Sequence, residues 1–194
     1  MINYVIICQT ILRQMIMKIF HAQSEKEIDI ARELFREYQN FLQVDLCFQG
    51  FEEELQSLPG KYADPNGVIL LAEHNGNIAG CVALRPIEPS DCNSPKCSDN
   101  KPVPVSEGIE KICEMKRLYV KDQYQGLSIG KKLAEMVIEQ AQKLGYEKMQ
   151  LDTLKRLDKA MTLYRKLGFY EISPYYANPL DEVVYWELDL QSIK

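Results

Sequence analysis

The chain has 194 residues, of which 46% are hydrophobic and 26% charged, as is typical of one soluble globular domain with its own core. Its net charge is −5, which argues against nucleic acid as a partner, because nucleic-acid-binding proteins usually carry a basic surface. No segment reaches the roughly 20 apolar residues of a membrane span. We therefore expect no membrane association and, by default, a cytoplasmic protein.

The first 16 residues are apolar but interrupted by Gln9, Arg13 and Gln14. They lack a basic segment ahead of the apolar stretch and a small-residue cleavage site, which disfavours a signal peptide. Met17 opens a segment that resembles a first strand. We therefore expect residues 1–16 to be an N-terminal extension and residues 17–194 to form a single domain.

Six cysteines are scattered along the chain. Cys47, Cys81 and Cys113 lie among apolar neighbours, and we expect them to be small buried thiols rather than halves of disulfides. Cys92 and Cys97 share a polar loop, but their spacing is loose and no histidine lies nearby. We therefore expect no metal site.

The first half of the chain predicts an edge strand, two helices and a hairpin. Ser24 and Glu27 have the spacing of a capping box, followed by apolar residues at helical spacing. Asn75-Gly76 between two apolar runs is a strong hairpin signal. The predicted elements are a strand at 18–22, helices at 25–42 and 51–58, and strands at 67–73 and 78–85. A segment rich in Pro, Ser, Asp and Asn, about 87–108, should be an exposed, mobile loop.

The second half predicts the order strand–helix–strand–helix–strand–strand. The first three of these elements imply a parallel strand pair joined by a helix. The elements are expected at 112–120, 128–144, 148–153, 158–167, 169–172 and 183–190. The sequence thus predicts an α+β domain with a mixed, largely antiparallel sheet and helices on both faces.

A short turn, Gln125 to Gly130, connects the strand at 112–120 to the next helix. The first turn of a helix offers free backbone N–H groups and the positive end of the helix dipole, and small residues allow a phosphate to approach them. Lys131 adds positive charge at the same place. The turn predicts a phosphate or pyrophosphate site, although a glycine turn with Ser128 as helix cap and no ligand explains the same residues.

Two blocks resemble motifs of the GNAT superfamily of N-acetyltransferases. Residues 113–138 resemble the acetyl-CoA-binding motif Q/R-x-x-G-x-G/A, with Ser128 where the family usually has glycine. Residues 160–169 resemble the motif A-x-x-L-Y-x-x-x-G-F, with Leu157 at the position where the family often has asparagine. The blocks occur in the family's order, separated by the expected strand.

This resemblance implies a GNAT-like sheet in which two parallel strands splay apart, and direct transfer of acetyl from acetyl-CoA to a primary amine of a small molecule. A protein lysine or N-terminal acetyltransferase and a catalytically inactive acyl-CoA sensor are the alternatives. Family analogy also suggests a homodimer. The residues expected to bind the coenzyme are Leu118, Tyr119, Val120, Gln125, Gly126, Leu127, Ser128, Ile129, Gly130 and Lys131.

The resemblance also places two catalytic residues. Tyr164 occupies the position of the family's general acid, although it also shares a helix face that fills the core. Glu114 is the candidate general base, directly or through water, but a solvated strand glutamate or an ion pair with Lys116 or Arg117 is an equally good explanation, and Asp152 is the fallback. Further candidates for the acceptor pocket, which surface or helix packing explains equally well, are Tyr175, Tyr176, Phe48 and Phe51.

Overall fold

The computed structural model describes residues 17–47, 50–87 and 111–192. The expected extension at 1–16, nearly all of the expected loop at 87–108, and the candidate Phe48 lie outside these residues. Within them, two apolar cores lie on opposite faces of one central sheet.

The sheet of the described residues has seven strands in the order β1-β2-β3-β4-β5-β7-β6. The β4–β5 pair is parallel and all other pairs are antiparallel. The strands are β1 (Met17–His21), β2 (Val68–His74), β3 (Asn77–Pro86), β4 (Ile112–Val120), β5 (Lys148–Leu154), β6 (Tyr170–Ile172) and β7 (Val183–Asp189). This arrangement confirms the predicted mixed, largely antiparallel sheet, with the first strand at its edge.

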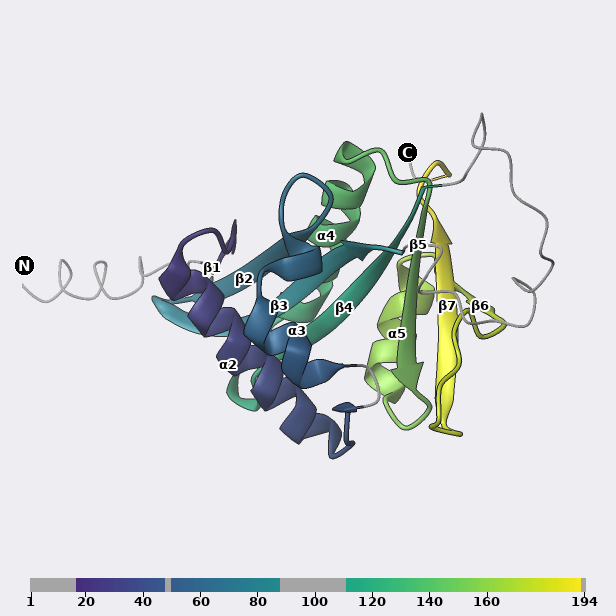
Figure 1. Ribbon diagram of the computed structural model, residues 1–194, viewed down its shortest axis with the longest axis horizontal. Helices are drawn as coiled ribbons and strands as arrows, with labels where there is room; N and C mark the ends of the chain where they lie inside the picture. The colour runs from purple at the N-terminus through teal and green to yellow at the C-terminus, as the bar shows by residue number, and fades with distance from the viewer. Residues whose placement is uncertain (1–16, 48–49, 88–110, 193–194) are drawn as a thin grey trace, which may run out of the picture.

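Helices cover both faces of the sheet, as predicted. Helices α2 and α3 lie on one face, whereas α4 and α5 lie on the other (Figure 1). The helices are α2 (Glu25–Leu42), α3 (Phe51–Ser57), α4 (Ile129–Lys143) and α5 (Asp158–Lys166), with short 3₁₀ helices η2 (Gly60–Tyr62) and η5 (Asp122–Tyr124).

Helix α2 begins at the predicted capping box. The hydroxyl of Ser24 accepts a hydrogen bond from the Glu27 N–H (3.4 Å), and the Glu27 carboxylate accepts one from the Ser24 N–H (2.9 Å). Two of the free N–H groups at the start of the helix are thereby satisfied. The buried residues Ile28, Leu34 and Phe35 recur at helical spacing and pack α2 against the sheet.

The hairpin between β2 and β3 also follows the prediction. Asn75 and Gly76 both have positive φ angles, 52° and 81°, as a two-residue type I′ turn requires. His74 and Asn77 pair across its base. The turn therefore sets how β2 and β3 pair at this end of the hairpin.

The cysteine predictions hold for two of three residues. Cys81 and Cys113 are buried, and burial raises the pKa of both thiols. Cys47 is exposed, so its expected burial is wrong. Its apolar neighbours mislead because Leu46 points into the core while Cys47, one residue further along an irregular segment, points outward.

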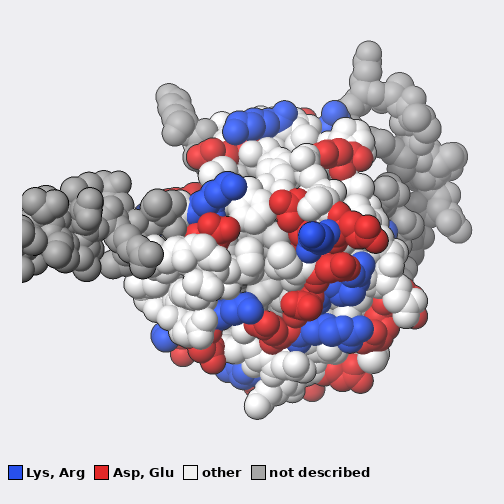
Figure 2. Space-filling model, turned by 90° about the vertical axis from the view of Figure 1, so that its left-hand side faces the viewer, with Lys and Arg blue, Asp and Glu red and all other residues white. Residues whose placement is uncertain are grey.

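Acidic and basic side chains alternate over the face that carries β1 and the first turns of α2 (Figure 2). Such mixed charge is typical of an ordinary solvated surface. Among the helices that the structure describes, none is both long and apolar enough to cross a membrane.

Candidate active site

Strands β4 and β5 form a fork. Their parallel pairing runs only from Ile112 opposite Lys148 to Glu114 opposite Gln150, although both strands continue beyond these pairs (Figure 1). β5 stays paired with β7 along its whole length. The last six residues of β4 therefore have no strand partner on the β5 side, which is the splayed arrangement that the sequence resemblance implies.

A β-bulge in β4 accompanies the fork. The β3–β4 register shifts so that Arg117 and Leu118 lie opposite a single residue, Val82, and Arg117 has a positive φ of 58°. A bulge bends its strand and increases the local twist, which turns the end of β4 away from β5. Gly80 permits the close approach of β3 here, because a Cβ atom on it would lie 2.3 Å from the Tyr119 carbonyl oxygen.

The end of β4 offers open backbone groups. Lys121 donates its N–H to Ala79 on β3 (2.9 Å), and alternate residues of a strand direct their backbone groups to opposite sides. The N–H and C=O groups of Leu118 and Val120 therefore point away from β3, into the fork, whereas those of Tyr119 point toward β3. An extended, amide-containing ligand can pair with the first two residues.

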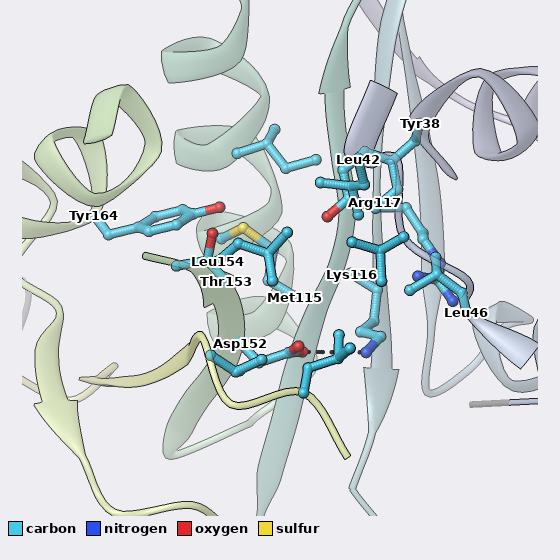
Figure 3. Close-up of a pocket in the computed structure, with 14 residues that line it drawn as sticks. Tyr38, Leu42, Leu46, Met115, Lys116, Arg117, Asp152, Thr153, Leu154 and Tyr164 are labelled. Atoms are coloured by element: carbon cyan, nitrogen blue, oxygen red, sulfur yellow. Dashed lines mark hydrogen bonds and ion pairs between the residues drawn. The ribbon is translucent and has the colours of Figure 1, made fainter. Parts of the chain in front are cut away.

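The fork contains a pocket whose lining comes from both faces of the sheet (Figure 3). Tyr164, Met115 and Leu118 belong to the α4/α5 face, whereas Tyr38 and Leu154 belong to the α2/α3 face. The full lining is Tyr38, Leu42, Val44, Leu46, Met115, Lys116, Arg117, Leu118, Asp152, Thr153, Leu154, Tyr164, Leu180 and Val183.

Tyr164 projects from α5 into the pocket, with its hydroxyl toward Thr153 and Met115 (Figure 3). Its ring packs between Phe169 and Trp186, at centroid distances of 5.7 and 6.5 Å. The ring is therefore part of the core while the hydroxyl lines the pocket. Burial raises the pKa of Tyr164 well above its usual value, so the phenol keeps its proton at neutral pH.

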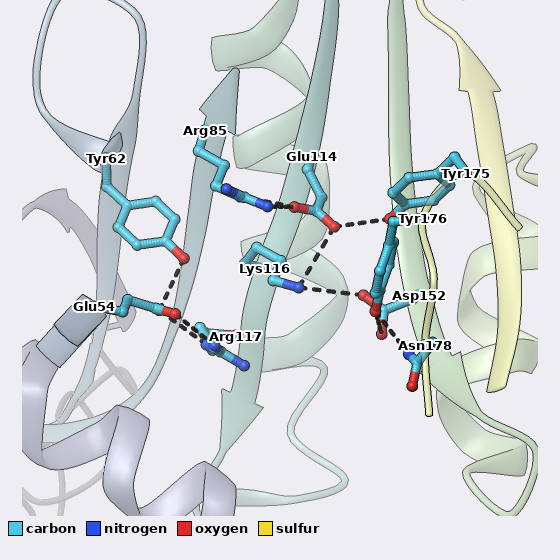
Figure 4. A network of polar contacts seen from close by, with 10 residues as sticks. All are labelled: Glu54, Tyr62, Arg85, Glu114, Lys116, Arg117, Asp152, Tyr175, Tyr176 and Asn178. Atoms are coloured by element: carbon cyan, nitrogen blue, oxygen red, sulfur yellow. Dashed lines mark hydrogen bonds and ion pairs between the residues drawn. The ribbon is translucent and has the colours of Figure 1, made fainter. Parts of the chain in front are cut away.

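Arg117 is a buried cation, with 3% of its side chain exposed. Its Nε and Nη2 groups donate to the two carboxylate oxygens of Glu54 on α3 at 3.0 and 2.6 Å. Tyr62 donates to the same carboxylate (2.9 Å), and the guanidinium lies 5.0 Å from the ring centroid of Phe51 (Figure 4). Burial alone would raise the pKa of Glu54, but the Arg117 charge outweighs it and holds that pKa below its usual value.

Glu114 lies in the paired part of β4 and is 1% exposed. Its carboxylate accepts hydrogen bonds from Arg85 Nε (2.8 Å) and from the Tyr175 hydroxyl (2.8 Å), and it pairs with Lys116 Nζ at 3.4 Å (Figure 4). Three donors thus surround it. Glu114 does not line the pocket, and the expected ion pair with Lys116 is present, whereas Arg117 pairs elsewhere.

Asp152 on β5 is the single carboxylate among the described residues that line the pocket. Its two oxygens accept from Lys116 Nζ (3.3 Å) and the Tyr176 hydroxyl (3.0 Å). Asn178 donates to the Tyr176 oxygen at 2.8 Å and so holds that ring in place. Burial alone would raise the pKa of Asp152, but the Lys116 charge and these hydrogen bonds leave it below its usual value.

The predicted anion turn leads into α4 beside the end of β4. The first intrahelical bond runs from Lys132 N–H to Ser128 C=O (3.1 Å), so the N–H groups of Ile129, Gly130 and Lys131 have no acceptor within the helix. A Cβ atom on Gly130 would lie 3.5 Å from the Val120 side chain. The open end of the helix therefore adjoins the open edge of β4.

Ser128 occupies the N-cap position of α4, but its side chain makes no capping hydrogen bond. Its φ is 60° and that of Gly126 is 82°, so the turn uses the left-handed conformation that favours glycine. Leu127 is 42% exposed, Ile129 is buried, and Gln125 donates to Asp122 (2.8 Å). The positive φ of residue 128 explains why glycine suits this position in the motif that the turn resembles.

The remaining acceptor-pocket candidates are divided by the structure. Tyr175 and Tyr176 lie beside the pocket through their bonds to Glu114 and Asp152. Phe51 is buried in the core beneath Arg117. In place of these candidates, Leu180 of the same loop and Val44 and Leu46, which follow α2, line the pocket.

Sequence reasoning missed the Arg117–Glu54 pair and the contribution of Arg85. These partners lie 63 and 29 residues from the residues they bind. One signal was available: the strand at 112–120 carries Glu114, Lys116 and Arg117 in its middle, where charges need partners.

The chain resembles known acetyltransferases over most of its length. Residues 28–169 match the model of the acetyltransferase (GNAT) family. An uncharacterised N-acetyltransferase of Schizosaccharomyces pombe is 37% identical over 85% of this chain and 90% of its own, and one of Dictyostelium discoideum is 35% identical over 91% and 100%.

Solved structures show the same fold. A GNAT-family acetyltransferase from Staphylococcus aureus superposes with a TM-score of 0.65 at 22% identity, over 90% of this chain and 99% of that one. The acetyltransferase yncA from Salmonella typhimurium, solved with acetyl-CoA, superposes with a TM-score of 0.57 at 18% identity, over 91% and 95%. The family model and the two relatives show that the protein is an acyltransferase. The chain belongs to the GNAT family of acetyl-CoA-dependent acetyltransferases.

The described residues contain no group of three or more His, Cys, Asp or Glu side chains placed to hold a metal ion.

Proposed function

We propose that the protein transfers acetyl from acetyl-CoA directly to a primary amine of a small molecule. The observation that carries this proposal is the two-sided pocket in the fork, where a phenol on one face lies opposite a carboxylate on the other. A transfer of this kind needs a donor for the leaving thiolate and a group that favours positive charge on the attacking nitrogen.

The coenzyme has a continuous path in this proposal. The free N–H groups at the start of α4 suit its pyrophosphate, and the open backbone of Leu118 and Val120 suits the amides of its pantetheine arm. Bound there, acetyl-CoA supplies the activated acetyl thioester. Gln125, Gly126, Leu127 and Lys131 would line the path. The backbone groups of Tyr119 point toward β3, so its neighbours Leu118 and Val120 would bind the coenzyme instead.

Tyr164 is proposed as the general acid. Its hydroxyl lines the pocket on the α4/α5 face, and its raised pKa keeps it protonated where a thiolate needs a proton. The proton would pass from the phenol to the departing sulfur, and the phenol would be reprotonated from solvent.

Asp152 is proposed to receive the amine on the α2/α3 face, because its carboxylate lines the pocket while Glu114 is covered. The amine enters uncharged, its nitrogen becomes positive as it attacks, and the Asp152 charge stabilises that state. As the C–S bond breaks and the amide forms, Asp152 would take the surplus proton from nitrogen and pass it to solvent. Glu114 would act through Lys116, which it holds against Asp152 at 3.4 and 3.3 Å.

The test is steady-state release of coenzyme A from acetyl-CoA with a panel of primary amines, compared with binding of acetyl-CoA alone. We expect turnover with small amines. Binding without turnover of any amine would indicate a sensor, and turnover only with peptides would indicate a protein acetyltransferase.

The two carboxylates can be separated by pH profiles of Asp152→Asn and Glu114→Gln. We expect Asp152→Asn to lower kcat/KM by about 100-fold, with the larger loss at low pH, where free amine is scarce. Glu114→Gln should have a smaller effect with an unchanged profile. The reverse pattern would assign the base to Glu114.

A further inference from the structure

The lining of the pocket combines aliphatic side chains with three charged ones. The walls on the α2/α3 face come from Leu42, Val44, Leu46, Leu180 and Val183. The charged side chains that line the pocket are two cations, Lys116 and Arg117, and one anion, Asp152. Behind the lining, Glu54 pairs with Arg117 and Glu114 pairs with Lys116, so the charge of each cation is partly offset.

Charges behind the lining do not use up the donors of Arg117. A guanidinium has five N–H donors, and the structure gives Arg117 hydrogen bonds from Nε and Nη2 only, both to Glu54. Its Nη1 group has no acceptor among the described residues, although the side chain is 97% buried and lines the pocket. Nη1 is not among the buried side-chain atoms of the described residues that lack a partner, so it is accessible and can donate to a ligand oxygen in the pocket.

Lys116, unlike Arg117, pairs with carboxylates of both β4 and β5. Its ammonium is shared between Glu114 and Asp152 at 3.4 and 3.3 Å, and these bonds hold it at the junction of the two strands. The guanidinium, with its flat edge and unused donors, is thus the better partner for a ligand oxygen, since Arg binds carboxylates through a planar fork.

From these contacts we infer that the acceptor is an amine that also carries a carboxylate and an apolar body, that is, an amino-acid-like compound. Its carboxylate binds Arg117 Nη1, its apolar part lies against the aliphatic walls, and its amine lies between Asp152 and the acetyl carbon. The reactive form has a neutral amine and a charged carboxylate, and the unused Nη1 donors of Arg117 suit that carboxylate. This inference rests on the proposed function and narrows its substrate class.

The test uses matched acceptors with wild-type protein. Leucine is compared with 3-methylbutylamine, which lacks the carboxylate, and with leucine methyl ester, which masks it. The amine of 3-methylbutylamine is more basic than that of leucine and the ester amine is less basic, so a preference for leucine over both cannot come from basicity. A second pair, 6-aminohexanoate and hexylamine, covers a longer separation between amine and carboxylate.

We expect kcat/KM to be 10- to 100-fold higher for the carboxylate compound in at least one set, as a charged hydrogen bond predicts. Equal or better use of the compounds without a carboxylate in both sets would overturn the inference and leave the proposed function intact. Binding of acetyl-CoA without turnover of any compound would overturn both.

Arg117→Gln supplies the matched variant, with Arg36→Gln, on the exposed side of α2, as control. The ratio of kcat/KM for leucine to that for 3-methylbutylamine should fall to about one in Arg117→Gln and stay unchanged in Arg36→Gln. A general loss of folding lowers both rates without moving the ratio. An unchanged ratio in a folded Arg117→Gln protein would contradict the assignment, and the wild-type comparison holds even where the variant does not fold.

Discussion

The two faces of the sheet at the fork differ in chemistry. On the α4/α5 face the pocket meets apolar side chains and one phenol, Tyr164. On the α2/α3 face it meets a network of ion pairs built on Glu54, Arg117, Lys116 and Asp152. In the proposed reaction, the departing thiolate needs a proton donor, which Tyr164 supplies on one face. The attacking amine needs a negative charge nearby, which Asp152 supplies on the other.

The strongest test of the coenzyme side is Gly130→Glu. The new carboxylate would stand among the free N–H groups at the start of α4, where it competes with a pyrophosphate by both charge and volume. We expect affinity for coenzyme A to fall by more than about 100-fold, or roughly 3 kcal/mol, in isothermal titration. Gln140→Glu adds the same charge further along α4 and should bind normally. Normal binding by Gly130→Glu would contradict the anion site.

The same face is tested chemically by Tyr164→Phe. Loss of a general acid should lower kcat by about 10²- to 10⁴-fold, with little change in the affinity for acetyl-CoA. Because the pKa of Tyr164 is raised, the wild-type kcat should show no alkaline loss from this group up to about pH 9. Tyr170→Phe, on exposed β6, is the control and should retain activity. A wild-type kcat in Tyr164→Phe would contradict the general-acid role and show that Tyr164 only fills the core.

The charged face is tested by Glu54→Gln, which leaves the Arg117 guanidinium without its charged partner. Breaking a buried pair costs about 3–5 kcal/mol, so the free energy of unfolding in urea should fall by roughly this amount. Glu52→Gln is the control on the same helix, because its pair with Arg36 is exposed and should contribute less than about 1 kcal/mol.

The effect of Glu54 should also depend on pH. Its pKa is lowered in the folded protein from an ordinary value of 4.5, so its stabilisation is complete above that value and is lost as the pH falls through the lower, folded pKa. The difference between wild type and Glu54→Gln should therefore shrink below about pH 4. A difference that stays constant down to pH 2 would show that the carboxylate charge is not its source.

The smallest effect is expected for Ser128→Gly. Relief of the left-handed conformation favours glycine by about 1 kcal/mol, whereas the greater freedom of the unfolded chain costs about 0.4–1 kcal/mol. The free energy of unfolding should thus change by less than about 1 kcal/mol, with coenzyme affinity equal or slightly higher. Ser128→Val, which is branched at Cβ, should destabilise the protein clearly. Equal stability of Ser128→Val would contradict the positive φ.

The sequence predicts the fold well where local signals act alone. The capping box at Ser24 and the turn at Asn75-Gly76 each determine backbone geometry within a few residues, and the structure has both. The parallel β4–β5 pair follows from the order strand–helix–strand. Ends of elements differ from the predictions by at most one residue.

The site is less predictable for a physical reason. Tyr164 and the anion turn belong to local motifs, so their positions could be stated in advance. The burial of Glu114 and the pairing of Arg117 with Glu54 depend on contacts between distant segments and on a bulge at an arginine. Nothing in the residue type of Arg117 indicates a positive φ, since that conformation favours glycine and asparagine.

The bulge at Arg117 also changes which residues of β4 direct their backbone groups toward β3. One extra residue acts as a phase shift in a period-two element, so β4 pairs with β5 in its first half and presents free backbone edges in its second. Removing a single residue there would leave Tyr164, Glu114 and Asp152 in the sequence. We expect that it would also let β4 and β5 pair along their whole length. The proposed binding of an extended ligand in the fork thus depends on the length of a strand as much as on its side chains.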